Sequence, residues 1–102
     1  MNAHSALVKQ VRDFLLVLGA RAFKNAGGIG QERGRADIDA VFRGRWVSCE
    51  VKTGKGVLSV DQKEVKADVE VAGGVYIVVR ELEDVLRGLR QIDVTVDERV
   101  IL

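Results

Sequence analysis

Two acidic stretches of the chain carry side chains whose types and spacing could build a metal-assisted hydrolytic site. Asp37 and Asp39 alternate along the first stretch, and Glu50 and Lys52 are two residues apart in the second. If the stretches are neighbouring strands, the period of two lets Asp37 and Glu50 converge at one end of a hairpin. Carboxylate oxygens with water completing the shell suit Mg²⁺, and an adjacent ammonium can orient a water molecule.

A purely structural interpretation competes with this one. Asp39, Glu50 and Lys52 could instead form a cross-strand salt bridge on an exposed face, and spacing alone favours that alternative. Cys49 is expected to be a small core residue rather than a nucleophile. The only histidine, His4, lies near the N-terminus, which disfavours a histidine-based hydrolase or a zinc enzyme.

Glycines and basic residues surround the acidic stretches. Residues 25–35 contain four glycines and are expected to form a long loop: Gly27, Gly28, Gly30 and Gly34. The loop lacks the Gly-Lys-Ser/Thr ending of a nucleotide phosphate loop. Four basic residues flank the expected site and are candidate contacts to phosphate groups, although each alone could be an ordinary surface charge: Lys24, Arg33, Arg35 and Lys55.

The apolar pattern predicts the elements that must position these residues. Helical spacing predicts three helices, one capped by Ser5 and ended by Gly19, one over residues 59–72 and one over 81–89. Alternating or continuous apolar runs predict strands over residues 20–24, 36–43, 46–53 and 75–79, with a further edge strand over 92–102. Residues 43–45 make the reversal of a hairpin.

The segment over residues 59–72 has apolar positions that fit either a strand or a helix. The capping-box spacing of Ser59 and Gln62, with Gly73 and Gly74 as the stop, favours the helix. A helix that joins a hairpin strand to a buried strand is a crossover, so the sheet contains parallel and antiparallel pairs. We therefore predict an α/β sandwich with a mixed sheet.

Length and composition set further limits. The chain has 102 residues, 47% hydrophobic and 30% charged, which suits a single domain over residues 1–102. One cysteine excludes an internal disulfide, and the absence of a signal-like or membrane-spanning stretch predicts a soluble, cytoplasmic protein. The net charge of +1 hides an asymmetry: residues 1–66 carry 12 Lys/Arg against 7 Asp/Glu, and residues 67–102 carry 4 against 8. A basic half permits contacts to phosphates.

The acidic motifs together resemble a known group of nucleases. Gly-Arg-Ala-Asp at 34–37, Glu-Val-Lys at 50–52 and Leu-Ser-Val-Asp-Gln at 58–62 are similar to motifs of the PD-(D/E)xK nuclease superfamily. Within it they resemble the VRR-NUC (virus-type replication-repair nuclease) family, as do Ala-Gly-Gly-Val-Tyr-Ile-Val-Val at 72–79 and Glu-Asp-Val-Leu at 83–86. The resemblance covers about residues 7–90, most of the chain.

The resemblance implies a restriction-endonuclease-like sandwich and a role for each motif residue. Asp37 and Glu50 would bind Mg²⁺, or Mn²⁺ in its place, and the backbone carbonyl of Val51 would add a ligand. Lys52 would position or polarise the attacking water. Gln62 would help to hold the water or the phosphate, in partial conflict with its capping role, since one amide has few hydrogen bonds to give. The reaction would be in-line attack of water on a DNA phosphodiester.

The chain departs from the family pattern within the first motif and in the N-terminal helix. Ala36 replaces a common proline, which should alter rigidity more than chemistry. Many relatives carry an acidic residue on the N-terminal helix, where this chain offers Asp13, with Gln10 and His4 as weaker substitutes.

Asp39 is a third departure, because it occupies a position that is commonly apolar in relatives. It is either a supplementary metal ligand or, as we favour, a salt-bridge partner of Arg43 or Arg45.

The function implied is a Mg²⁺-dependent DNA endonuclease with a role in DNA repair. As proposed for stand-alone members of the family, it would act as a homodimer on branched DNA such as a four-way (Holliday) junction. The alternative is a non-catalytic nucleic-acid-binding or assembly domain with the same fold. A sequence-specific restriction enzyme is disfavoured, because little of the chain lies outside the expected core to contact bases.

Overall fold

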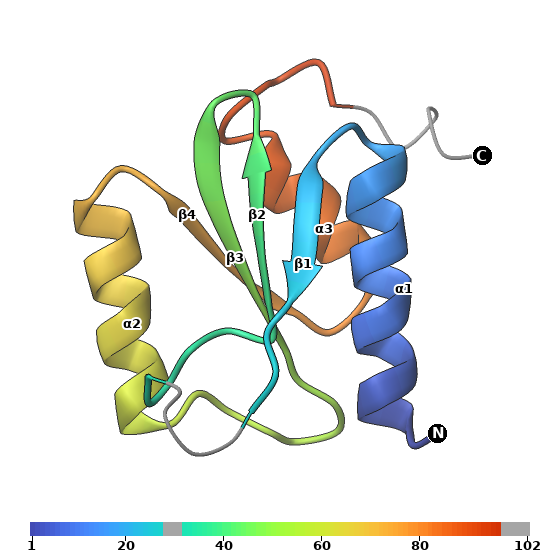
Figure 1. Ribbon diagram of the computed structural model, residues 1–102, viewed down its shortest axis with the longest axis vertical. Helices are drawn as coiled ribbons and strands as arrows, with labels where there is room; N and C mark the ends of the chain where they lie inside the picture. Colours follow the sequence, from blue (N-terminus) through green and yellow to red (C-terminus); the bar gives the residue numbers. More distant parts are fainter. Residues whose placement is uncertain (28–31, 97–102) are drawn as a thin grey trace.

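The helices and strands follow the predicted order (Figure 1). The computed structural model describes residues 1–27 and 32–96. Along the described chain the elements are α1 (Ala3–Val17), β1 (Arg21–Lys24), β2 (Ile38–Phe42), β3 (Arg45–Val51), α2 (Val60–Val71), β4 (Val75–Val79) and α3 (Leu82–Leu89).

The four strands form one sheet in the order β1-β2-β3-β4. β1 with β2 and β2 with β3 are antiparallel, whereas β3 with β4 is parallel. The parallel pair requires a crossover, and α2 supplies it. The predicted fold class, an α/β fold with a mixed sheet flanked by helices, is therefore confirmed.

The core lies between one face of the sheet and the helices α1 and α3. α1 contributes Val11 and Leu15, both fully buried, and α3 contributes Val85 and Leu89. From β3 the alternate residues, including Cys49, point into this core, which confirms the prediction that Cys49 is a packing residue. Every residue of β4 is buried or nearly so, as its continuous apolar run predicts.

α2 lies at the opposite side of the sheet, beside β4 in Figure 1. No residue of α2 is buried, and its contacts with the sheet are made mainly with β4. The outer face of the sheet over β1, β2 and the start of β3 is consequently left partly open.

Several predicted boundaries were wrong by a few residues. α1 begins at Ala3, because Asn2 rather than Ser5 is its cap: the Asn2 side chain accepts a hydrogen bond from the Ser5 amide. β2 begins after Asp37 and β3 ends before Lys52, so both residues lie just outside the strands. No membrane-spanning helix occurs in the described part of the chain.

The predicted C-terminal edge strand is wrong where it can be compared. Residues 92–96 form turns with no strand, and residues 97–102 lie outside the described chain. Gly28 and Gly30 of the predicted loop also lie outside it.

Candidate active site

Asp37 and Glu50 meet where β2 begins and β3 ends. Ile38 pairs with Cys49 in the antiparallel register, which places the preceding Asp37 opposite Glu50. The Asp37 amide donates a hydrogen bond to Oε1 of Glu50 at 3.2 Å, and Oδ2 of Asp37 accepts one from the Val51 amide at 2.8 Å. The hairpin therefore brings together the two carboxylates that the sequence suggested as a pair.

Lys52 and Gln62 both contact Glu50. Nζ of Lys52 lies 3.4 Å from Oε2 of Glu50, and Nε2 of Gln62 donates to the same oxygen at 3.0 Å. Glu50 is only 4% exposed, so its pairing with Lys52 is not the exposed-face salt bridge considered from the sequence. The four residues predicted to be catalytic thus form one connected cluster, although their catalytic roles stay predictions.

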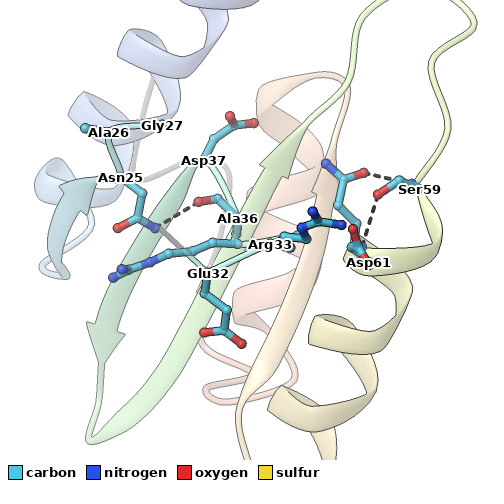
Figure 2. Close-up of a pocket in the computed structure, with 12 residues that line it drawn as sticks. Asn25, Ala26, Gly27, Glu32, Arg33, Ala36, Asp37, Ser59 and Asp61 are labelled. Carbon is cyan, nitrogen blue, oxygen red and sulfur yellow. Dashed lines mark hydrogen bonds between the residues drawn. The ribbon is translucent and has the colours of Figure 1, made fainter. Parts of the chain in front are cut away.

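The capping box at the start of α2 fixes the orientation of Gln62. Oε1 of Gln62 accepts from the Ser59 amide at 2.9 Å, while the Gln62 amide donates to Oγ of Ser59 at 3.1 Å (Figure 2). The amino group of the same side chain is then free to donate to Glu50. The two roles that seemed to compete are divided between the oxygen and the nitrogen of one amide.

The electrostatics of the site disfavour two ionised carboxylates without a cation. Burial raises the pKa of Glu50, and the negative charge of Asp37 raises it further, while Lys52 partly lowers it. Burial, with the charges of Asp39 and Asp37, raises the pKa of Cys49 to about 12. Cys49 is therefore a neutral thiol in the core rather than a nucleophile.

The donor set fits a hard divalent cation. In residues 1–27 and 32–96, no three His, Cys, Asp or Glu side chains gather as a ready-made metal cluster. Mg²⁺ does not require one, because it keeps several waters and binds through one or two carboxylates. Asp37 and Glu50 can provide these, and the backbone carbonyl of Val51 remains a predicted additional ligand.

The N-terminal helix contributes His4 to the site, not Asp13. Nε2 of His4 lies 3.3 Å from Oδ2 of Asp37. Asp13 pairs with Lys9 of the same helix at 2.7 Å. Of the three residues that the sequence offered on this helix, His4 therefore contacts Asp37, whereas Asp13 is paired with Lys9.

Asp39 is a salt-bridge residue, as favoured, but its predicted partners were wrong. Nε of Arg35 lies 3.4 Å from Oδ2 of Asp39, and Oγ of Ser48 donates to Oδ1 at 2.7 Å. The previously considered partners are engaged elsewhere: Arg43 pairs with Asp93, and Arg45 donates to the carbonyl of Gly73. Both Asp39 oxygens have partners and the residue is only 4% exposed, so Asp39 links β2 to its neighbours beside the site.

Asn25 is a site residue that the sequence analysis missed. Nδ2 of its side chain donates to the Ala36 carbonyl at 2.8 Å and to Oδ2 of Asp39 at 2.7 Å. Its backbone N–H donates to the Asp37 carbonyl at 2.8 Å. These bonds hold the two ends of the glycine-containing loop together. A lone asparagine after a short strand gives no sequence signal for such a role.

An open cleft of about 490 Å³ lies beside Asp37. Figure 2 shows its walls, which come from the loop that precedes β2 and from the start of α2. Asp37, Gln62, Arg33 and Arg35 line it. Lys24 and Lys55, also considered as phosphate contacts, are not among the residues that line this cleft.

Gly34 allows the loop to lie close against the start of α2. Its φ is +76°, and a Cβ at this position would lie 2.3 Å from the carbonyl oxygen of Asp61. The loop can press against the first turn of α2 only because residue 34 has no side chain.

Comparisons with known proteins are sparse. No family model and no curated protein matches the chain, so membership of the VRR-NUC family stays a prediction. A similar solved structure is that of Hjc from Archaeoglobus fulgidus, described as a Holliday junction resolvase from an archaeal hyperthermophile. The two chains are 27% identical with a TM-score of 0.48, and the match covers 69% of this chain but only 63% of Hjc.

Proposed function

We propose that this protein is a metal-dependent DNA endonuclease that hydrolyses phosphodiester bonds. The observation that carries the proposal is the buried Glu50 carboxylate, which is hydrogen-bonded by the Asp37 amide and Gln62 and paired with Lys52. Two of these partners, Asp37 and Gln62, line an open cleft. An acidic pair with a lysine and an amide suits hydrolysis of a phosphate ester better than it suits structure alone.

Each residue of the cluster has a part in this chemistry. Asp37 and Glu50 would hold Mg²⁺ or Mn²⁺, which when bound supplies charge stabilisation to the phosphate oxygens and acidifies water. Lys52 keeps its ammonium beside Glu50, where it can orient the attacking water and offset negative charge. Gln62 holds Glu50 in place through its amino group. Arg33 lines the cleft and can contact a phosphate.

The substrate we propose is branched DNA, and the active form a homodimer. A chain of 102 residues has little surface with which to recognise a DNA branch, and two copies would place two cutting sites on one substrate. The four-way junction, the substrate named for the similar Hjc protein, is the first one to test. Light scattering of the free protein and of its DNA complex gives the oligomeric state directly.

The test is cutting of four-way, flap and linear duplex DNA with Mg²⁺, with Mn²⁺ and with EDTA. We expect metal-dependent cutting that Glu50→Ala reduces by at least ~10²-fold, because one of the two carboxylates for the cation is lost. DNA affinity measured in Ca²⁺ should change little. Glu64→Ala, at an exposed position of α2, is the matched control and should cut normally.

Two outcomes would contradict the proposal. Cutting by Glu50→Ala at the wild-type rate would show that the site is wrongly assigned. Binding of DNA by the wild type without metal-dependent cutting of any substrate would favour a non-catalytic nucleic-acid-binding domain.

A further inference from the structure

The outer face of the sheet presents an exposed aromatic patch. Phe23, Val41 and Trp46 are 37%, 41% and 42% exposed, on three neighbouring strands. They are open because α2 lies over β4 and leaves this part of the face uncovered (Figure 1). Arg21, which pairs with Val41 in the register, lies at the edge of the patch.

Trp46 is held in a fixed orientation although much of it is exposed. Its indole Nε1 donates to Oγ of Ser48 at 3.0 Å, and Ser48 in turn donates to the buried Asp39. Phe23 packs edge-on against the indole, with ring centroids 6.1 Å apart and an interplanar angle of 71°. A ring held from two sides loses little conformational entropy when a ligand stacks on it.

Trp46 forms one wall of a hollow between the sheet and α2. Two adjoining cavities, of about 390 and 290 Å³, are both lined by Trp46, Val65 and Val69. We call this space the aromatic slot and define it by these three residues. Its walls are an indole ring on the sheet and two valines on the helix, so the slot suits a flat, largely apolar ring.

The aromatic slot adjoins the cleft of the candidate active site. The smaller of its cavities is also lined by Glu32, Arg35 and Ala36, and all three line the cleft as well. A DNA strand in the cleft would therefore lie next to the apolar surface of the slot.

We propose that the aromatic slot binds an unpaired nucleobase of the DNA strand whose phosphates lie in the cleft. This proposal rests on the proposed function and narrows its branched substrate to DNA with unpaired bases next to the cut, such as the flap among the DNAs to be tested. Stacking on an aromatic ring is available to every base. Glu32 and Asp68 also line the slot, where their carboxylates disfavour a phosphate but can accept hydrogen bonds from the amino group of a base.

The fluorescence of Trp46 tests the proposal, because it is the only tryptophan in the chain. The wild-type protein is titrated in EDTA, where no cutting occurs, with a gapped duplex and with a fully paired duplex of the same sequence. A base stacked on the indole quenches its emission. We expect strong quenching with the gapped duplex and little with the paired one.

Variants give a second measurement that does not depend on fluorescence. In anisotropy titrations with labelled DNA, Trp46→Ala should weaken binding of the gapped duplex by roughly 5- to 150-fold, the range of one stacked base. It should leave binding of the paired duplex within about twofold. Trp46→Phe keeps a ring and should restore most of the affinity. Val71→Ala, at an exposed position of α2 outside the slot, should bind like the wild type.

Three outcomes would overturn the proposal: equal quenching by both duplexes, equal loss of affinity for both, or no loss in Trp46→Ala with its circular dichroism unchanged. A wild-type dimer that Trp46→Ala converts to a monomer in light scattering would also overturn it, because a second copy of the chain would then occupy the slot. Metal-dependent cutting without selective quenching would contradict base binding in the aromatic slot but support the proposed nuclease function. Selective quenching without cutting would contradict the nuclease function but support base binding in the slot.

Discussion

At the scale of single residues, the site depends on how Glu50 is surrounded. Its two oxygens accept from the Asp37 amide and the Gln62 side chain, and Lys52 supplies the nearby positive charge. These partners offset only part of the effect of burial beside Asp37, since the pKa of Glu50 stays raised. Without a cation, the ionised form of Glu50 is therefore disfavoured, and a bound cation would stabilise it.

The raised pKa of Glu50 predicts a pH dependence of stability in the absence of metal. A raised carboxyl pKa means that the native state binds a proton more readily than the unfolded chain, whose ordinary value is 4.5. The contribution of Glu50 to stability is thus fully present below that value and is lost as the pH rises through the native pKa. Urea unfolding in EDTA across pH measures this contribution as the free energy of unfolding of the wild type minus that of Glu50→Ala. We expect this difference to fall as the pH rises. A rise with pH would contradict the raised pKa of Glu50.

His4 gives a second prediction at this scale. Its imidazole contacts Oδ2 of Asp37 and helps to fix the orientation of that carboxylate. Groups that orient a metal ligand are typically worth ~10- to 100-fold in metal affinity. We expect His4→Ala to weaken Mn²⁺ binding, followed by electron paramagnetic resonance, by about 10-fold. Asp13→Ala on the same helix is the control, and equal effects of the two variants would show that His4 has no specific role.

At the scale of elements, the site is a junction between the β2–β3 hairpin, the loop that precedes it and the start of α2. The hairpin brings Asp37 opposite Glu50, and the capping box of α2 directs Gln62 at Glu50. Asn25 holds the loop to the strand, and Gly34 lets the loop reach the helix. A local change in any of these elements should therefore alter the geometry of the carboxylates.

Two glycines with similar backbone torsions make a matched test of this junction. Gly34 and Gly44 have φ of +76° and +77°, but a Cβ would strike the Asp61 backbone only at Gly34 and meets nothing within 4 Å at Gly44. Gly44→Ala should cost ~1–2 kcal/mol of unfolding free energy from torsional strain alone. Gly34→Ala should cost a further ~1–3 kcal/mol and reduce cutting. Urea unfolding measures the loss of unfolding free energy in each variant, and a cutting assay measures the activity. Equal losses of unfolding free energy in Gly34→Ala and Gly44→Ala would argue against the close loop–helix contact.

At the scale of the whole molecule, one core supports an acidic site at one end of the sheet. The helices α1 and α3 pack on the inner face, while α2 covers only part of the outer one. The site draws on residues from α1 through α2, so any cation bound there links segments that are distant in sequence.

This linkage predicts that a divalent cation stabilises the entire fold. At a concentration 100 times its Kd, a cation that binds only the native state adds about 2.7 kcal/mol, which raises the Tm of a domain this size by ~10 °C or more. Calorimetric scans with Mn²⁺ and with EDTA give the shift. Glu50→Ala should show almost none, and a shift of equal size in this variant would mean that the cation binds elsewhere.

Local sequence patterns were sufficient to predict the fold class and most residues of the candidate site. Strand alternation placed Asp37 and Glu50 on one hairpin, and the Ser59–Gln62 spacing predicted the cap of α2, because both depend on contacts within a few residues. Three contacts became known only from the way the elements pack. His4 rather than Asp13 reaches Asp37. Arg35 pairs with Asp39, and Asn25 joins the site. It also left Trp46 facing a hollow beneath α2. These contacts depend on how separate elements pack in space, which local spacing does not encode.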